Sequence, residues 1–381
     1  MRAVKGAQTY ATTSVDGTMS KPNQQAGHCR LTLRQLLLVL TSICIVPAYT
    51  AAQAQIDSPV QKKPPDQRLG INPWDMQSFL SDTPGYVDTN VGSIRIDLPW
   101  QQVQPRAGVF DWKALDSVVR TARANGMDVL ITLRAISSWG TKVPANAKDL
   151  YKGASLPLDM TSWETFVSAM ADRYKGGGVA YEIENEPNSK FWSGTMDDYL
   201  TLLKATFAAI TRSDPRATVL SGALACHTAF AYPDSATTEK QNQSFDRWQN
   251  AILATHAFNT IGVHDYYFPD GAVNGWTFIS YLDHVADLAR AAGCAKCPIW
   301  ITETGYVSRP QKAGTRTDAG SPQNQARWAA ESFQQAFDHR VERVYWLFLK
   351  DHPNTGYFAS MGLTDVHGTA RPALSVISHW K

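Results

Sequence analysis

The chain alternates short β-branched runs with longer amphipathic stretches from Arg68 onward. The short runs have the length and composition of buried strands, and the stretches between them place apolar residues at helical spacing. Eight strands separated by helices over about three hundred residues predict a single (β/α)8 TIM barrel, an α/β fold, over residues 68–381. The expected strands are 69–72, 93–98, 128–133, 179–184, 218–223, 261–266, 299–302 and 343–348, and the expected helices include 111–124, 163–174, 196–211, 281–292, 323–337 and 372–379.

The composition permits one large core and argues against a nucleic-acid partner. The chain has 381 residues, is 44% hydrophobic and contains 12 tryptophans, so it can bury a barrel of this size. Residues 1–54 carry five basic residues and one acidic residue, a net +4, so removing them changes the formal charge from +2 to −2. A nucleic-acid-binding protein needs a clustered basic face, and none is evident in the remaining sequence.

The N-terminal segment predicts export. Arg30 and Arg34 precede an apolar run over residues 36–46, and Ala52-Gln53-Ala54 then supplies small residues at the spacing that a signal peptidase reads. The apolar run is short for a permanent bilayer-spanning helix, although an uncleaved membrane anchor is the alternative. We therefore expect residues 1–54 to be a signal peptide, residues 55–67 to be a flexible tether, and the mature protein to be periplasmic or secreted without a stable membrane anchor.

The cysteines fit an oxidising compartment. Cys294 and Cys297 are three residues apart just before an expected strand, and in an exported protein this spacing favours a small structural disulfide over a metal or redox site. Cys226 is then an odd thiol.

Two glutamates end two of the expected strands. Glu186 follows the fourth run and Glu303 ends the seventh. Cleavage of a glycosidic bond with retention needs two carboxyl groups about 5–5.5 Å apart, one to protonate the leaving oxygen and one to attack the sugar carbon. Barrel enzymes keep their chemistry at the carboxyl ends of the strands, so the pair predicts a glycosidase site there. The alternative is two ordinary rim carboxylates.

Strand alternation predicts which way these side chains point. If Tyr181 and Ile183 meet the helices, Glu186 faces the barrel axis. On the seventh strand, Glu303 would face the axis while Trp300 lies toward the helices.

Other strand ends offer partners for the pair. Arg95 and Tyr266 are expected to hold Glu303 as a carboxylate by charge and hydrogen bonding, and Asn185 to donate a hydrogen bond to a sugar hydroxyl. His264 is expected near the mouth, Trp346 as an apolar floor, and loop aromatics such as Trp74 and Trp192 as stacking surfaces. The alternatives are Arg95 as a core partner of Glu182 or Glu184, His264 as a core histidine, and Trp346 as barrel packing.

Several motifs carry a family resemblance. Asn185-Glu186-Pro187 within residues 181–188, followed by Phe191-Trp192, resembles the acid/base segment of clan A glycoside hydrolases, most of all family 39. Residues 95–100, 264–266, 301–305 and 361–365 also resemble that clan.

The resemblance implies a retaining glycoside hydrolase acting on a polysaccharide or oligosaccharide. The histidines show no His-Glu-x-x-His pair or clustered ligand spacing, so we expect neither a metal nor a cofactor. The resemblance implies Glu186 as acid/base and Glu303 as nucleophile, with Asn185, Arg95, His264, Tyr266 and Trp346 around the cleaved sugar. Glu184 departs from the pattern, because relatives often carry an aromatic residue there. The sequence also lacks an accessory β-domain and so looks like single-domain, exopolysaccharide-associated members that cut within chains. The alternatives are an exo-acting glycosidase of the clan and a catalytically silent glycan-binding barrel.

Overall fold

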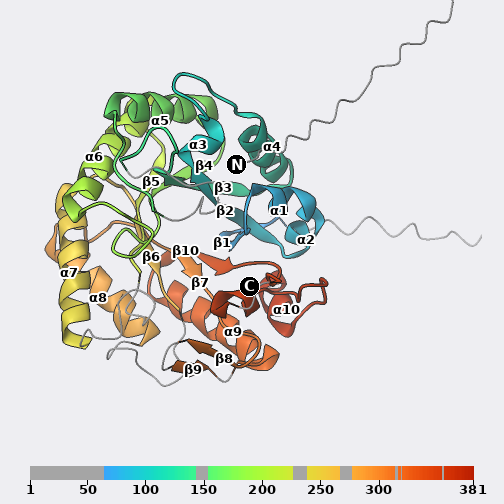
Figure 1. Cartoon of the computed structure of the whole chain (residues 1–381). Helices are drawn as coiled ribbons and strands as arrows, with labels where there is room; N and C mark the ends of the chain where they lie inside the picture. The colour runs from blue at the N-terminus through green and yellow to red at the C-terminus, as the bar shows by residue number, and fades with distance from the viewer. Residues whose placement is uncertain are drawn as a thin grey trace, which may run out of the picture. The chain divides into compact units, whose positions relative to one another are not determined.

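Eight parallel strands form the centre of the protein, and helices surround them (Figure 1). The computed structural model describes residues 64–142, 153–225, 238–266, 277–313, 316–318, 320–353 and 356–381. The predicted signal peptide, residues 55–63 of the predicted tether, and Cys226 lie outside the described residues. The central strands are β1 (Asp66–Asn72), β2 (Val91–Pro99), β3 (Asp128–Arg134), β4 (Val179–Ile183), β5 (Thr218–Ser221), β6 (Ile261–His264), β7 (Ile299–Thr304) and β10 (Val341–Leu347).

The strands close into a barrel. Their order is β5-β4-β3-β2-β1-β10-β7-β6. Every neighbouring pair in this sheet is parallel, as a (β/α)8 fold requires. The two end strands approach each other at an isolated parallel bridge between Leu220 and Thr260, where the N–H of Ser221 donates to the carbonyl of Thr260 over 3.2 Å. The predicted TIM barrel is confirmed.

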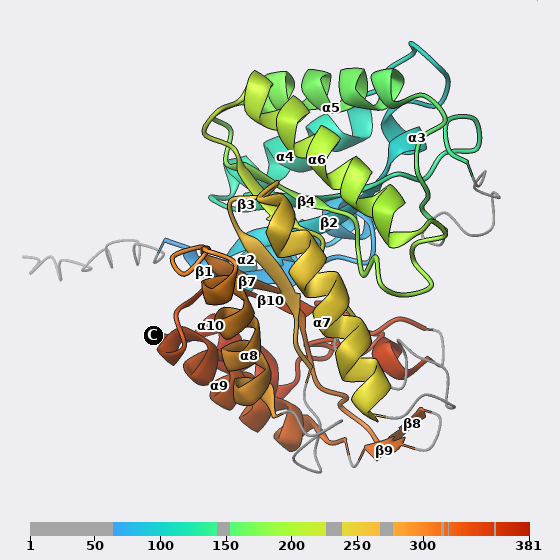
Figure 2. The ribbon, with the colours of Figure 1, turned by 90° about the vertical axis from the view of Figure 1, so that its left-hand side faces the viewer.

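Helices connect the strands in sequence. Figure 2 shows α7 running between α6 and α8 along one side of the barrel. A short antiparallel hairpin, β8 (Gln311–Ala313) with β9 (Arg316–Asp318), follows β7, and a 3-10 helix, η1 (Tyr357–Ser360), follows β10. The helices are α1 (Met76–Ser81), α2 (Thr83–Asp88), α3 (Trp100–Val103), α4 (Lys113–Ala124), α5 (Met160–Tyr174), α6 (Met196–Ser213), α7 (Thr238–Thr255), α8 (Phe278–Ala291), α9 (Pro322–Asp338) and α10 (Pro372–Ser378).

Local sequence explains where the helices begin. Thr195 caps α6 in a capping box with Asp198, and Asp159 accepts from the first N–H groups of α5. The six predicted helices match α4, α5, α6, α8, α9 and α10 within three residues at each end. Helix α7 is not among the predicted helices, because residues 238–244 are all polar and the apolar spacing starts only at Phe245.

The barrel has an apolar layer outside the sheet and a second one inside it. On β2, Ile94, Ile96 and Leu98 are buried in the main core. Inside the barrel, a smaller cluster is made of Leu130, Ala180, Leu220, Trp300 and Tyr345. Trp300 therefore faces the barrel axis, and its predicted position toward the helices is wrong.

The predicted disulfide between Cys294 and Cys297 is present, in the turn before β7 at the amino-terminal end of that strand. Within the described residues, no helix combines the length and apolar character needed to cross a bilayer.

Candidate active site

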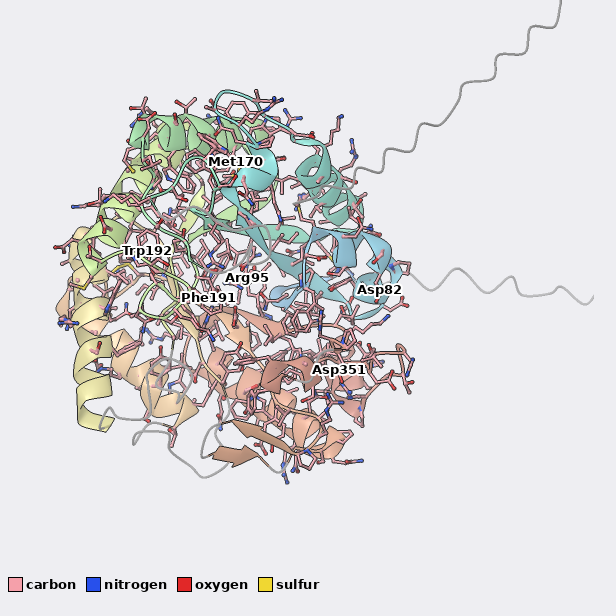
Figure 3. All side chains as sticks on the ribbon, viewed as in Figure 1. Asp82, Arg95, Met170, Phe191, Trp192 and Asp351 are labelled. Atoms are coloured by element: carbon pink, nitrogen blue, oxygen red, sulfur yellow. A yellow bond between two sulfur atoms is a disulfide. The ribbon has the colours of Figure 1, made fainter. Side chains whose placement is uncertain are left out.

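A cavity of about 450 Å³ opens where the barrel strands end. Its lining includes Asn72, Arg95, Asn185, Glu186, Tyr266 and Glu303; Arg95 lies in the middle of β2, and the others lie at the carboxyl-terminal ends of strands or in the residues just after them. Figure 3 labels Arg95 near the centre of the ring of strands, with Phe191 and Trp192 on the side nearer α6. The volume is typical of a site for a small ligand.

Glu303 is held by two donors. Its Oε1 accepts from Nη1 of Arg95 over 2.9 Å, and its Oε2 accepts from the hydroxyl of Tyr266 over 2.6 Å. Both partners are those expected from the sequence. A carboxyl group with a guanidinium on one oxygen and a hydroxyl donor on the other is stabilised as the anion.

A register shift in β7 allows Glu303 to face the cavity. Val263 of β6 pairs with Ile301, but the next residue, His264, pairs with Glu303, so one residue of β7 is skipped. Thr302 and Glu303 consequently both reach the interior, Thr302 donating to Oε1 of Glu182 over 2.8 Å. The predicted position of Glu303 is right, but simple alternation is not the reason.

Glu186 reaches the cavity through an irregular backbone. Strand β4 ends at Ile183, and Glu184 and Glu186 then take left-handed conformations with φ of 69° and 46°. The N–H of Glu186 donates to the carbonyl of Ala223 over 2.9 Å, which ties this turn to the residues after β5. Two left-handed non-glycine residues so close together are unusual and are a form of strain found at functional sites.

His264 lies between the two glutamates. Its Nδ1 is 3.0 Å from Oε1 of Glu186 and 3.6 Å from Oε2 of Glu303. One atom from each of these three side chains lies within 4.8 Å of the other two. Burial opposes a charge on the imidazole, but the carboxylates of Glu303 and Glu186 outweigh it and raise the pKa of His264.

Arg95 connects the cavity to the barrel interior. It is 4% exposed, and its Nε donates to Oε2 of Glu182 over 2.7 Å while Nη2 donates to Oδ1 of Asn185 over 2.7 Å. Its Nη1 also reaches Oδ1 of Asn72 at 3.1 Å. The two expectations for Arg95, core partner of Glu182 and partner of Glu303, therefore hold together. Burial opposes its charge, but the surrounding carboxylates raise its pKa.

The aromatic wall of the cavity differs from the prediction. Trp346 is fully buried, contacts Phe333 of α9 and donates from Nε1 to the carbonyl of Met361, so the predicted apolar floor is wrong for this residue. Trp74 and Phe348 line the cavity instead, with their rings stacked at 3.4 Å between centroids. Phe348 follows β10 and has a φ of 72°. This left-handed conformation breaks the strand alternation, so Phe348 lines the cavity although Trp346, two residues earlier, does not.

Trp192 also packs rather than lining the cavity. It is 6% exposed, donates from Nε1 to the carbonyl of Thr195 and meets Tyr199 of α6 edge to face. Its neighbour Phe191 is the residue of this pair that lines the cavity. The sequence predicted an aromatic residue at this side of the cavity, but the predicted residue, Trp192, was wrong and its neighbour Phe191 occupies the position.

Comparison with known proteins identifies the family of this chain. Residues 81–350 match the model of the cellulase family, glycosyl hydrolase family 5. The chain belongs to glycosyl hydrolase family 5. No curated protein matches the chain at a significant level.

Solved structures similar to this family 5 chain include members of two families. A family 39 glycoside hydrolase from Bacteroides cellulosilyticus WH2 has a TM-score of 0.58 and 17% identity, covering 82% of this chain and 62% of that one. The GH39 enzyme from Xanthomonas axonopodis pv. citri has a TM-score of 0.58 and 16% identity, covering 82% and 65%. GH5_18 from Streptomyces cattleya in complex with GlcNAc has a TM-score of 0.57 and 16% identity, covering 83% and 80%.

These comparisons confirm the clan A resemblance, while the family model is that of family 5 rather than family 39. At these identities the structures show the shared barrel fold. The present chain spans less than two thirds of both family 39 structures.

The family 5 site also contains a buried ion-pair network that was not predicted from the sequence. Nη1 of Arg134 is 2.9 Å from Oδ2 of Asp97, and its Nε is 3.0 Å from Oε2 of Glu184. Arg134 and Glu184 are wholly buried, whereas Asp97 lines the cavity. Arg95 and Asp97 are two residues apart on β2 and share a face, but nothing in the sequence indicated that Arg134 ends β3 beside them. Burial raises the pKa of Glu184, although Arg134 opposes the shift.

Glu186, His264 and Glu303 have the spacing of metal ligands. However, Glu303 already accepts from the guanidinium of Arg95, and a fixed positive charge 2.9 Å from a ligand oxygen opposes a cation. The donor set therefore suits a catalytic carboxyl pair better than a metal centre.

Proposed function

We propose that the protein is a retaining glycosidase that works by double displacement. The observation that carries the proposal is the spacing of Glu186 and Glu303, whose closest carboxyl oxygens and the His264 nitrogen lie within 4.8 Å of one another. Retaining enzymes keep their carboxyl groups about 5–5.5 Å apart, whereas inverting enzymes need about 6.5–9.5 Å to fit a water molecule. The close spacing favours direct attack by one carboxylate.

The hydrogen-bond partners support a different role for each glutamate. Glu303 accepts from Arg95 and Tyr266, which stabilises the anion that a nucleophile must be. Glu186 has no arginine partner among the described contacts, and its Oε1 faces a nitrogen of His264. In this environment the carboxyl group of Glu186 can carry a proton. Glu186 is therefore the acid/base and Glu303 the nucleophile.

The reaction then runs in two steps. Glu186 donates its proton to the leaving oxygen while Glu303 attacks the anomeric carbon, which breaks the glycosidic bond and forms a glycosyl ester. Glu186 next removes a proton from water, the water oxygen attacks the anomeric carbon, and the bond to Glu303 breaks. Arg95 and Tyr266 stay in contact with the nucleophile and position it for both steps.

A covalent trap tests this mechanism. An activated 2-fluoro glycoside slows the second step, so the sugar should remain attached to Glu303 and be found there by mass spectrometry of the digested protein. A label on Glu186 would contradict the role assignment. An anomeric product of inverted configuration, seen by NMR early in the reaction, would contradict the double displacement itself.

We also propose a polysaccharide or oligosaccharide cut within the chain as substrate. Support comes from the aromatic surface of Trp74, Phe191 and Phe348 in the cavity, since apolar ring faces suit sugar stacking. The sizes of the products, followed over time, would distinguish cleavage within the chain from exo-acting cleavage. Internal cleavage releases mixed oligosaccharides from the start, whereas the exo-acting alternative releases one small product.

Export belongs to the same proposal. The disulfide between Cys294 and Cys297 supports an oxidising compartment. Cell fractionation with N-terminal sequencing of the mature protein tests it, and a cytoplasmic protein that retains its first residues would contradict it.

A further inference from the structure

The turn that carries Glu186 has a strained backbone. Glu184 and Glu186 both take left-handed conformations, with φ of 69° and 46°, and neither is a glycine. A non-glycine residue stays in this region only where the surrounding structure holds it there. The contacts of this turn therefore decide where the carboxyl group of Glu186 lies.

Glu184 is fixed to the end of β3. Its side chain is wholly buried, with Oε2 accepting from Nε of Arg134 over 3.0 Å and Oε1 accepting from the N–H of Ala135. Its own N–H donates to the carbonyl of Leu133 over 3.0 Å. Three consecutive residues at one strand end thus bind both carboxylate oxygens and the backbone of Glu184. A change in the φ of Glu184 would move its side chain away from these donors.

Arg134 also holds the other end of the same segment. Its Nη2 donates to the carbonyl of Phe191 over 3.5 Å, and its guanidinium lies over the ring of Phe191, 5.5 Å from the centroid. Its Nη1 donates to Oδ2 of Asp97 over 2.9 Å, which fixes the guanidinium to β2. Residues 184–191 therefore begin and end on one buried side chain, and Glu186 lies between the two contacts.

We propose that Arg134 and Glu184 are positioning residues that hold Glu186 where it can pass a proton to the leaving oxygen. Neither of them lines the cavity in the described part of the chain, so they act through the turn and not on the sugar. This inference rests on the proposed role of Glu186 as the acid/base. It gives a use to Glu184, the position at which this sequence departs from the family pattern.

The ion pair is better suited to positioning than to stability. Two apolar residues can often replace a buried ion pair without loss of stability, because the pair has to offset the cost of taking both charges out of water. Apolar side chains would not provide the directional contacts that hold Glu184 in its left-handed conformation or bind the carbonyl of Phe191. Joint replacement of Arg134 and Glu184 therefore keeps the core filled and releases the turn.

The double variant Arg134→Met/Glu184→Met tests this role. Phenyl and dinitrophenyl glycosides of one sugar report on acid catalysis, because phenolate needs a proton to leave and dinitrophenolate does not. The sugar is chosen by screening the wild-type protein on dinitrophenyl β-glycosides of glucose, mannose, galactose, xylose and cellobiose. In the double variant, kcat/KM for the dinitrophenyl glycoside should stay within about threefold of wild type. The value for the phenyl glycoside should fall by about 10²-fold, as expected when a catalytic group is misplaced by about 1 Å.

Two variants control for general damage to the protein. Arg343→Met/Asp128→Asn removes a 2.9 Å ion pair at the opposite end of β3, the strand that Asp128 begins and Arg134 ends. It should leave the ratio of the two kcat/KM values unchanged. Arg134→Lys keeps the charge but not the planar fork that reaches three partners together, so its loss on the phenyl glycoside should be intermediate.

Crystal structures of the wild-type protein and the double variant give a readout that needs no substrate. Oε1 of Glu186 is 3.0 Å from Nδ1 of His264 in the wild-type chain. In the double variant, position 184 should leave the left-handed region, and Glu186 should move out of hydrogen-bonding distance of His264.

The outcomes separate this inference from the proposed mechanism. An equal loss on both glycosides, or an unchanged position of Glu186 in the double variant, would overturn the positioning role. Glu186→Ala is the reference, because it should also lose activity selectively on the phenyl glycoside. If Glu186→Ala shows no selective loss, the acid/base assignment fails. If Glu186→Ala shows the selective loss and the double variant does not, only the positioning role fails.

Discussion

Arg95 donates to Glu303 at 2.9 Å with the same guanidinium that donates to the fully buried Glu182 at 2.7 Å. The residue that positions Glu303, the proposed nucleophile, is therefore also the charge partner of a carboxylate deep in the barrel. Thr132 and Thr302 complete the hydrogen bonds of Glu182. Catalytic geometry and barrel stability are linked through one side chain.

Removal of Arg95 should therefore destabilise the fold. In Arg95→Met the carboxylate of Glu182 stays buried without its cation, and we expect the free energy of unfolding in urea to fall by about 3–5 kcal/mol. Arg173→Met is the matched control, because Arg173 forms a solvent-exposed pair with Asp116 whose loss should cost less than about 1 kcal/mol. Equal losses in the two variants would show that the buried pair does not have this role.

The two glutamates should differ in how activity is lost. Glu303→Ala should abolish turnover of every substrate, because the attacking group is gone. Glu186→Ala should lose about 10²–10⁴-fold on substrates with poor leaving groups. It should still form the glycosyl intermediate from a dinitrophenyl glycoside, whose leaving group needs no proton.

Azide provides the control for these roles. It needs no general base, so it should restore turnover of the dinitrophenyl glycoside by Glu186→Ala and give a glycosyl azide, but it should not restore turnover with retention by Glu303→Ala. Identical behaviour of the two variants would refute the assignment.

The two aromatic residues near the end of β10 should have separable effects. Phe348→Ala removes half of the stacked pair with Trp74 and should raise KM by about two- to tenfold with a small change in unfolding free energy. Trp346→Phe removes the hydrogen bond to Met361 inside the core and should lower stability by about 1 kcal/mol while KM stays near the wild-type value. Kinetics and urea unfolding of both proteins measure the difference, and a KM effect confined to Trp346→Phe would contradict this structure of the site.

Asp265 should make stability depend on pH. It is 2% exposed, and burial raises its pKa well above the ordinary value of 3.8. Its folded form therefore holds a proton that the unfolded chain has lost, and stability falls as pH rises from about 4 toward the folded pKa. Asp265→Asn removes this loss, so its gain in unfolding free energy should be on the order of 1 kcal/mol at neutral pH and approach zero near pH 4. A gain that is the same at both pH values would disprove the linkage.

The sequence determined the eight barrel strands and six of the helices. Runs such as 128–133 are short, β-branched and bounded by turn residues, so they indicate strands without knowledge of their neighbours. Because parallel barrel strands present their carboxyl ends on one face, the positions of Glu186 and Glu303 at two strand ends were enough to predict that they meet. Arg95 and Tyr266 were predicted as partners of Glu303 on the same grounds, and both contact it.

Tertiary structure decided which side chain at each strand end faces the cavity. The skipped residue in β7 brings Thr302 and Glu303 inside together, and the left-handed Phe348 takes the cavity position predicted for Trp346. A shift of one residue moves every following side chain to the opposite face. Such a shift arises from pairing with a neighbouring strand, so the local sequence does not predict it. The ion pairs of Arg134 with Asp97 and Glu184 join the ends of β2, β3 and β4. They also depend on tertiary structure, because a buried charge pairs with a group that is close in space.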